Sequence, residues 1–293
     1  MKKEQTTISA FTFLRNGEML GYPFIESIKS VLPLVDEFIV NIGPCEDNTV
    51  ALVEAIDNKK IKIIHSVWNE KMHARGYVYG QQKMIAQFNC SGDWAFYVEA
   101  DEVIHENDIE NIREATIKYR DDNEVEAIAF NYLHFYGNMK TNLNSPSWYR
   151  SETRIIKNSI RTYAPDGLYW IVLKSKKIGR YPKAIKLDAT IFHYGWVRSE
   201  EQTDLKLQKV SKYWKKTHEE RTDYSQIDYK TLRKFTGTHP KIMQKHVSDE
   251  TEVFIADPNY KLTKKDKRNR LLLKIESIFK NDFSKKHYSI VKR

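Results

Sequence analysis

Four apolar segments rich in β-forming residues set the fold class of this chain. They span residues 8–14, 37–42, 61–65 and 94–99, and each gap between them is long enough to hold a helix. Strands that alternate with helices favour a mostly parallel sheet with helices on both faces. Ligands of such α/β sheets bind beyond the carboxyl ends of the strands, so functional side chains are expected at that edge.

The gaps between these segments carry helix signals. Pro23 suits the first position of a helix whose apolar residues recur on one face. Residues 48–56 and 74–88 fill the next two gaps, although two glycines interrupt the second. Asn107, with Glu110 three positions later, predicts the start of a fourth helix.

The pattern changes after residue 125. Four further segments are expected to be strands without regularly interleaved helices, at residues 127–136, 152–157, 168–173 and 189–194. A polar loop is expected at 138–147, and helices from residue 199 onward. We predict an α/β half at 1–125, a second half of the same domain at 126–198 with a smaller mixed sheet that closes the cleft, and a helical extension at 199–293.

Composition and charge narrow the class of protein. Cys45 and Cys90 form neither a disulfide framework nor a metal-binding spacing, which favours a reducing, cytoplasmic compartment. Residues 1–7 lack the apolar stretch of a signal peptide, and no segment is long and apolar enough to span a membrane. Residues 262–293 hold 11 Lys and Arg against 3 Asp and Glu, so they carry +8 of the +9 net charge. The nearly neutral remainder argues against nucleic acid as a partner.

The fourth apolar segment ends in three carboxylates within four positions, Glu99, Asp101 and Glu102. Because side chains alternate along a strand, we expect Glu99 and Asp101 to point the same way, with Ala100 leaving room between them. Paired carboxylates suit Mg²⁺ or Mn²⁺, which take oxygen ligands and share them with a diphosphate. The alternative is a solvated acidic turn that leads into the next helix.

Several motifs together resemble those of family 2 glycosyltransferases with the GT-A fold, over roughly residues 7–200. The opening residues 11–16, the Asp-Asn-Thr turn at 47–49 and the strand end at 99–101 carry this resemblance. Three later motifs, at 148–149, 153–156 and 192–196, are similar to those of bacterial members that modify surface polysaccharides and lipopolysaccharide cores. The family commonly has Asp-x-Asp, so Glu99 is a departure that concerns the first acid more than Asp101.

The resemblance implies a metal-dependent, inverting transfer of a sugar from a nucleotide diphosphate donor, with UDP favoured. Asp101 would bind Mn²⁺ or Mg²⁺ between the donor phosphates, and His193 would return to the metal or diphosphate, unless it is a packed histidine. The remaining donor-side positions are Phe11 or Phe13 at the nucleobase, Arg15 and Asn16 at the rim, Asp47 at the nucleoside and Glu99 beside Asp101. A core strand, a surface arginine and a helix cap are the structural alternatives for these residues.

Inversion also requires a base that removes the proton from the acceptor hydroxyl. Asp166 lies near where related enzymes place a catalytic acid, although Pro-Asp-Gly is equally a good β-turn. Asp188 and Glu102 are the reserve candidates.

The acceptor implied is a glycan or a lipid-linked molecule. In the tail, Thr263 and Asp266 resemble a capping box, and Leu271, Leu272, Ile275, Ile278 and Phe279 line one helical face. We expect that face to pack on the catalytic domain; the alternative is peripheral contact of residues 262–293 with an anionic membrane. Competing functions are a nucleotidyltransferase, for which only Arg15-Asn16-Gly17 stands where a glycine-rich basic loop is usual, or an inactive binding module.

Overall fold

The computed structural model describes residues 6–176, 178–219, 221–247 and 254–293. The expectation about the amino terminus falls largely on residues 1–5, which lie outside the described part of the chain. Among the described helices, none combines the length and the apolar character needed to cross a membrane.

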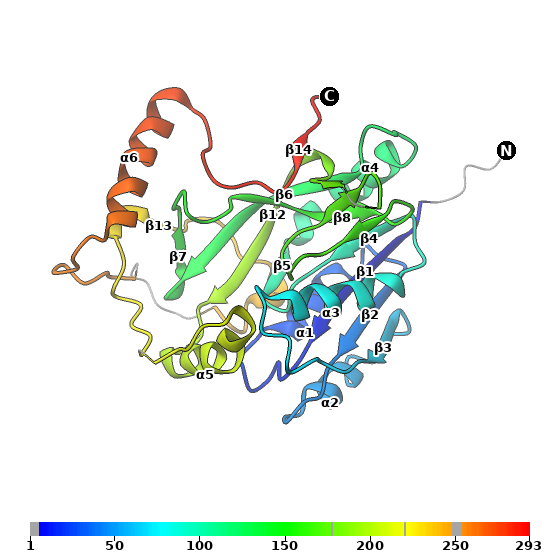
Figure 1. The fold of residues 1–293 in the computed structure, drawn as a ribbon, viewed down its shortest axis with the longest axis horizontal. Helices are drawn as coiled ribbons and strands as arrows, with labels where there is room; N and C mark the ends of the chain where they lie inside the picture. The colour runs from blue at the N-terminus through cyan, green and yellow to red at the C-terminus, as the bar shows by residue number, and fades with distance from the viewer. Residues whose placement is uncertain (1–5, 177, 220, 248–253) are drawn as a thin grey trace.

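The first half of the chain alternates strands and helices as predicted (Figure 1). The elements are β1 (Ile8–Leu14), α1 (Phe24–Val31), β2 (Glu37–Ile42), α2 (Thr49–Glu54), β3 (Ile61–His65), α3 (Tyr77–Phe88) and β4 (Trp94–Tyr97). β1 pairs in parallel with both β2 and β4, and β2 pairs in parallel with β3. The carboxyl ends of these strands therefore meet at one edge of the sheet.

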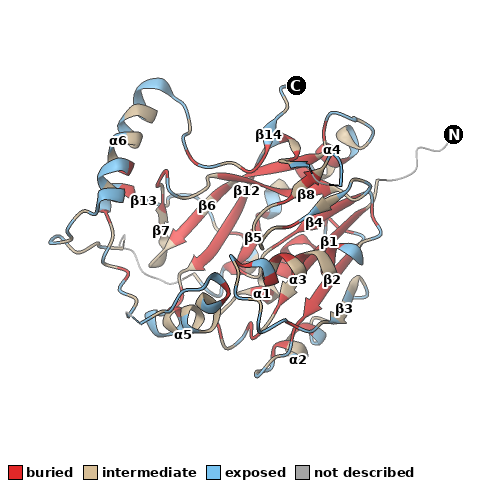
Figure 2. Cartoon of the chain, viewed as in Figure 1, coloured by how far each residue is buried: buried red, intermediate tan, exposed pale blue. Residues whose placement is uncertain are grey.

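Burial explains why these segments are strands. Every residue of β2 and of β4 is buried, as expected for strands covered on both faces. One face packs against the apolar side of α1, where Phe24, Ile28 and Val31 are buried, and α3 covers the other face at β1 and β2. Figure 2 shows the resulting buried centre of the sheet.

The second half extends the same sheet. Its principal elements are β5 (Glu102–Ile104), α4 (Ile109–Tyr119), β6 (Ala127–Tyr136), β7 (Asn138–Leu143), β8 (Ser151–Lys157) and β12 (Lys183–Trp196). β8 lies antiparallel between β4 and β6, and β12 pairs with both β6 and β5. The smaller sheet is antiparallel and consists of β9 (Thr162–Tyr163), β10 (Ile171–Leu173) and β11 (Gly179–Arg180).

Two local expectations were wrong. The segment predicted as a loop contains β7, which pairs with β6 and with β13 (Leu232–Lys234). Its polar sequence does not predict a strand, but hydrogen bonds to the two neighbouring strands stabilise one. Asn107 is not the helix cap, since it lies within the short 3₁₀ turn η1 (Glu106–Asp108) that precedes α4. The His105 ring accepts the backbone N–H of Asn107 instead.

The C-terminal extension contains two α-helices, α5 (Glu200–Ser211) and α6 (Lys264–Phe279), joined by irregular chain. Three 3₁₀ turns, η2 (Lys212–Trp214), η3 (Tyr229–Thr231) and η4 (Lys241–Met243), lie in this connection. The last residues return to the sheet, where β14 (Ser289–Ile290) pairs with β12. The extension is thus less helical than expected, and both of its short strands join the edges of the main sheet.

The expectation that α6 packs through its apolar face was wrong, although its capping box is present. The helix is held by polar contacts: Asn269 bonds Ser145 and Ser147, and Glu276 pairs with Arg150. Its apolar residues Leu271, Ile278 and Phe279 are instead 58%, 72% and 65% exposed. Polar contacts thus hold one side of this helix, while these large apolar side chains are exposed.

Candidate active site

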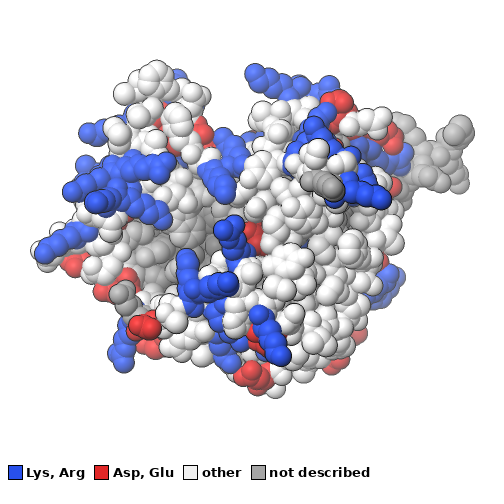
Figure 3. All heavy atoms as spheres, in the orientation of Figure 1, with Lys and Arg blue, Asp and Glu red and all other residues white. Residues whose placement is uncertain are grey.

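A cavity of about 480 Å³ lies at the carboxyl ends of β1 and β4. Six of the residues predicted from sequence line it: Phe13, Arg15, Asn16, Glu99, Asp101 and Asp166. The opposite wall comes from α5 and η2. Figure 3 shows Lys and Arg side chains gathered on the face of the molecule that carries α5 and α6.

Aromatic rings form one side of the cavity. Phe13 stacks on Tyr97 at 6.1 Å between ring centroids, and Trp68 and Tyr79 contact Phe13 edge-on. Phe11, two residues earlier on β1, lies on the same face of the strand as Phe13. It lies deeper and is fully buried against Tyr97. Of the two phenylalanines proposed for the nucleobase, Phe13 therefore lines the cavity and Phe11 belongs to the core beneath it.

Asp47 does not line the cavity. Its carboxylate accepts the backbone N–H groups of Met19 and Thr49, which joins the loop after β1 to the start of α2. Asn16, in contrast, lines the cavity while its side-chain oxygen accepts the N–H of Glu46. These contacts agree with the structural alternative for Asp47, a helix cap, rather than with a contact to the nucleoside.

Asp101 lies at the base of the cavity with a buried carboxylate. Its Oδ1 is 3.7 Å from His193 Nε2, and its Oδ2 is 3.4 Å from an Arg198 nitrogen and 3.6 Å from Lys206 Nζ. Burial opposes ionisation, but the neighbouring His193, Lys206 and Arg198 outweigh it and lower the Asp101 pKa to about 2. The carboxylate is therefore ionised at neutral pH.

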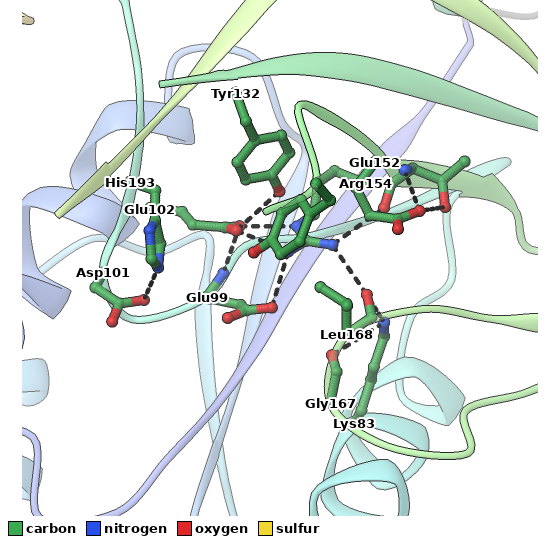
Figure 4. A network of polar contacts seen from close by, with 12 residues as sticks. Lys83, Glu99, Asp101, Glu102, Tyr132, Glu152, Arg154, Gly167, Leu168 and His193 are labelled. Atoms are coloured by element: carbon green, nitrogen blue, oxygen red, sulfur yellow. Dashed lines mark hydrogen bonds and ion pairs between the residues drawn. The ribbon is translucent and has the colours of Figure 1, made fainter. Parts of the chain in front are cut away.

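The neighbouring acids are organised by a fully buried arginine, Arg154, on β8 (Figure 4). Its guanidinium donates to Glu99 at 2.8 Å and to Glu102 at 2.7 Å, and Tyr132 donates its hydroxyl to Glu102. β4 ends at Tyr97, so the chain turns before Glu99 and the alternation expected along a strand does not apply. Glu99 points to Arg154, whereas Asp101 points to His193.

The charge balance in this group raises the pKa of Glu99. Burial is the largest cause, the nearby Glu102 carboxylate adds to it, and the pKa of Glu99 rises to about 8 despite the opposing effect of Arg154. Two carboxylates share one guanidinium here. Glu102 is enclosed by its partners and has no exposed surface, so it is held away from any acceptor.

The contacts of Asp101 fit a divalent cation. A carboxylate oxygen and an imidazole nitrogen, 3.7 Å apart, face each other at the end of the sheet. A side chain at position 195 would collide with both groups, because a Cβ there would lie 2.7 Å from His193 Nε2 and 3.0 Å from Asp101 Oδ2. No cluster of three or more His, Cys, Asp or Glu suited to a metal occurs among the described residues.

The base candidates occupy different places. Asp166 lines the cavity, and its Oδ1 also accepts the backbone N–H of Leu168, so it is both a turn residue and a cavity residue. Lys83, fully buried, holds the same turn by donating to the carbonyls of Gly167 and Leu168. Asp188 is exposed and lies outside the cavity lining.

Sequence reasoning missed the residues of α5 and η2. Lys206, Lys209 and Lys212 line the cavity, and the last two pair with Glu46 at 2.9 Å and Glu70 at 2.7 Å. The spacing of three between these lysines places them along one side of a helix, and that spacing was a usable signal. Nothing in the local sequence says which surface that side meets.

Aromatic residues of η2 complete this wall. Trp214 packs on Tyr79 at 5.0 Å between centroids, and Tyr213 contacts Trp68. Gly76 allows the close approach, since a Cβ there would lie 2.6 Å from the Trp214 ring. The C-terminal extension is therefore part of the cavity.

The sequence matches the family described as Glycosyl transferase family 2 over residues 22–170, just over half of the chain. The matched region contains the parallel strands β2–β4 and both Glu99 and Asp101. The protein is therefore a glycosyltransferase with an α/β fold of the GT-A type. The chain belongs to glycosyl transferase family 2, which confirms the resemblance seen in the sequence and favours this function over the nucleotidyltransferase and the binding module.

Comparison with solved structures gives distant similarities. S. aureus TarS, residues 1–349, has 15% identity and a TM-score of 0.35, over 53% of this chain and 48% of that chain. Glucosyl-3-phosphoglycerate synthase from Mycobacterium tuberculosis, in complex with Mn²⁺, UDP and phosphoglyceric acid, has 19% identity and a TM-score of 0.33, over 44% of each chain. This chain thus spans less than half the length of either structure. No curated protein matches it.

Replacing Glu99 by Gln tests the charge balance around Arg154. Because the folded-state pKa of Glu99 lies near 8, above its ordinary value of 4.5, the unfolded chain loses this proton first as the pH rises. The wild-type protein should lose stability between about pH 5 and 8, by at most about 1.4 kcal/mol per unit of pKa difference. E99Q should lack this loss, and the exposed E114Q variant should keep it. Urea unfolding at the two pH values measures the effect; equal pH dependence in wild type and E99Q would contradict it.

Proposed function

We propose that this glycosyltransferase moves a sugar from a nucleotide diphosphate donor, with UDP-sugar favoured, to a hydroxyl group of a glycan or lipid-linked acceptor. Transfer inverts the anomeric carbon and depends on Mn²⁺ or Mg²⁺. The observation that carries the proposal is the contact between Asp101, which lines the cavity, and His193 at 3.7 Å, with a glycine at position 195 beside both. Aromatic and basic walls extend from this point on either side.

Different walls of the cavity suit different parts of the donor. The rings around Phe13 offer flat apolar surfaces for a nucleobase. Lys206 lies beside Asp101 and, with Lys209 and Lys212, provides ammonium groups for the diphosphate. Arg15 is engaged by Glu70 and by the Pro44 carbonyl, so it contributes from the rim.

Asp101 and His193 are the residues that would hold the divalent cation. Such a cation supplies Lewis-acid stabilisation of the negative charge that develops on the leaving diphosphate. Asp101 is suited to this role because its carboxylate is ionised, and Gly195 excludes a side chain from the space beside it. Lys206 and Arg198 contribute fixed positive charge on the other carboxylate oxygen.

Asp166 is proposed as the base. In the transfer, the acceptor oxygen forms a bond to the anomeric carbon as the sugar–phosphate bond breaks, and the acceptor proton passes to a carboxylate. Asp166 lines the cavity and has one carboxylate oxygen, Oδ2, beyond the one that accepts the Leu168 N–H. Glu102 is enclosed by Arg154, and Asp188 lies outside the cavity lining, so neither reserve candidate is placed as well.

Replacing Asp101 by Asn tests the proposed metal site. D101N should remove the Mn²⁺-dependent part of UDP affinity, a loss of at least about tenfold or ~1.4 kcal/mol, because a neutral amide is a poor ligand for a hard cation. Calorimetric titration with UDP, with and without Mn²⁺, measures this. D188N is the matched control, since it removes an exposed carboxylate of the same type and should bind as wild type. A metal-dependent affinity retained in D101N would refute the assignment.

The base assignment predicts a split between binding and turnover. D166N should lower kcat by about 10²–10⁴-fold with donor affinity nearly unchanged, because a base acts in the transition state. The amide oxygen of Asn can still accept the Leu168 N–H, which preserves the turn. H193A, in contrast, should weaken Mn²⁺ binding. Steady-state kinetics with the true acceptor, beside UDP titration, separates the two; full turnover in D166N would place the base elsewhere.

We also propose that α6 contacts an anionic membrane at the inner face of the cell, where a lipid-linked acceptor would lie. Exposed Leu271, Ile278 and Phe279 alternate with the exposed basic residues Lys267 and Lys274. This is the composition of a helix that lies in a membrane interface, and each basic residue near the surface adds about 1 kcal/mol. Phe283, four residues beyond the helix, is also 46% exposed.

A triple variant tests the membrane contact. L271S/I278S/F279S should lose sedimentation with vesicles that contain anionic phosphatidylserine, while its melting temperature stays close to that of wild type, because these side chains are exposed in the free protein. F88S is the control, since Phe88 is 76% exposed at the end of α3. Absence of wild-type binding to these vesicles at low salt would reject the contact.

A further inference from the structure

A second histidine lies directly behind His193. His134 of β6 stands opposite His193 of β12 in the register of these parallel strands, and their Nδ1 atoms are 3.0 Å apart. The other ring nitrogen of His134, Nε2, is 2.7 Å from the backbone carbonyl of Tyr149. Both rings are buried, with 2% and 7% of their surface exposed. This gives a chain of contacts from Tyr149 through His134 and His193 to Asp101 (Figure 4 shows its last part).

The direction of the hydrogen bonds in this chain follows from the acceptor at its end. A carbonyl oxygen only accepts, so His134 Nε2 carries the proton that bonds Tyr149. His134 is buried, and its contacts are a carbonyl, a second imidazole and aromatic rings rather than an anion, so the ring is neutral and its Nδ1 is an acceptor. The proton between the two rings therefore belongs to His193 Nδ1.

This assignment determines what His193 presents to Asp101. His193 is itself buried, which favours the neutral ring. With its proton on Nδ1, its Nε2 carries a lone pair directed toward Asp101 Oδ1 at 3.7 Å. Two acceptors that face each other repel, and a cation bound by both would relieve that repulsion.

We propose that His134 is a positioning residue that fixes His193 in the Nδ1–H tautomer, the form whose Nε2 can bind a divalent cation together with Asp101. The proposal rests on the metal site of the proposed function and adds to it the group that sets the ligand. A histidine that ligates a metal usually donates its other N–H to an acceptor, and His134 supplies that acceptor here.

The surroundings of His134 hold its ring in one orientation. Tyr132 stacks on it at 5.3 Å between centroids, while Trp148 and Tyr149 contact it edge-on at 5.1 and 4.8 Å. Rotation of the ring would break the bond to the Tyr149 carbonyl and the bond to His193 at once. Trp148 and Tyr149 form one of the motifs noted in the sequence, and their packing on His134 gives that motif a physical role.

Two substitutions separate the acceptor from the packing. H134F keeps an aromatic ring among these neighbours but offers His193 no acceptor, so the His193 proton should move to Nε2, where Asp101 accepts it and a cation is excluded. H134N keeps an oxygen acceptor near the position of Nδ1 and should restore the wild-type tautomer in part. H239F is the control, because His239 also bonds a backbone carbonyl, that of Met139, but lies outside this chain of contacts.

The test has a direct readout that needs no metal. Long-range ¹H–¹⁵N spectra of histidine-labelled, metal-free protein report which nitrogen of His193 is protonated; we expect Nδ1–H in wild type, H134N and H239F, and Nε2–H in H134F. Mn²⁺ titration followed by electron paramagnetic resonance, with saturating UDP, should show affinity about 10–100-fold weaker in H134F than in wild type, and intermediate in H134N.

The outcomes distinguish this inference from the proposed function. Nε2–H in the wild-type protein, or an unchanged His193 tautomer in H134F, overturns the role of His134. If H193A and D101N weaken Mn²⁺ binding while H134F does not, the metal site stands and the positioning role is refuted. If H193A binds Mn²⁺ as wild type does, the metal assignment of His193 fails, and the positioning role fails with it even where the spectra show the expected tautomer.

Discussion

The buried guanidinium of Arg154 determines how the carboxylates after β4 are arranged. It pairs with Glu99 and Glu102 from a strand that lies antiparallel to β4, and it has no contact with solvent. Breaking a buried pair of this kind typically costs about 3–5 kcal/mol, because the remaining charges are left without a partner. With both glutamates engaged, Asp101 is the carboxylate of this group that remains directed toward His193.

The second half of the sheet supplies buried polar side chains to the end of the first half. β6, β8 and β12 extend the sheet, with β8 antiparallel to its neighbours, and bring His134, Arg154 and His193 beside the end of β4. These side chains are positioned by strand register, which is more rigid than loop conformation. The two halves of the sheet therefore contribute differently. The acids Glu99, Asp101 and Glu102 follow the last strand of the first half, and the second half supplies the side chains that orient these acids.

The C-terminal extension closes the cavity with charge as well as with rings. Lys206, Lys209 and Lys212 each lie beside an acid, Asp101, Glu46 and Glu70 respectively. In the proposed function, the diphosphate of the donor would bring its own negative charge among these pairs. The exposed apolar residues of α6 belong to the same extension but take no part in the cavity.

The sequence by itself determined the order of strands and helices and placed Asp101 just beyond the end of the fourth strand, because hydrophobic period and chain order are local properties. It could not assign partners. Arg154 is 55 residues from Glu99 and His134 is 59 residues from His193, and only the register of the folded sheet brings each pair together. For the same reason Glu102 and Asp47 were candidates in the sequence but are structural residues in the fold, the lysines of α5 were missed, and the apolar face of α6 was expected to be buried. Local pattern records which residues are apolar or charged, whereas the tertiary structure decides which of them meet.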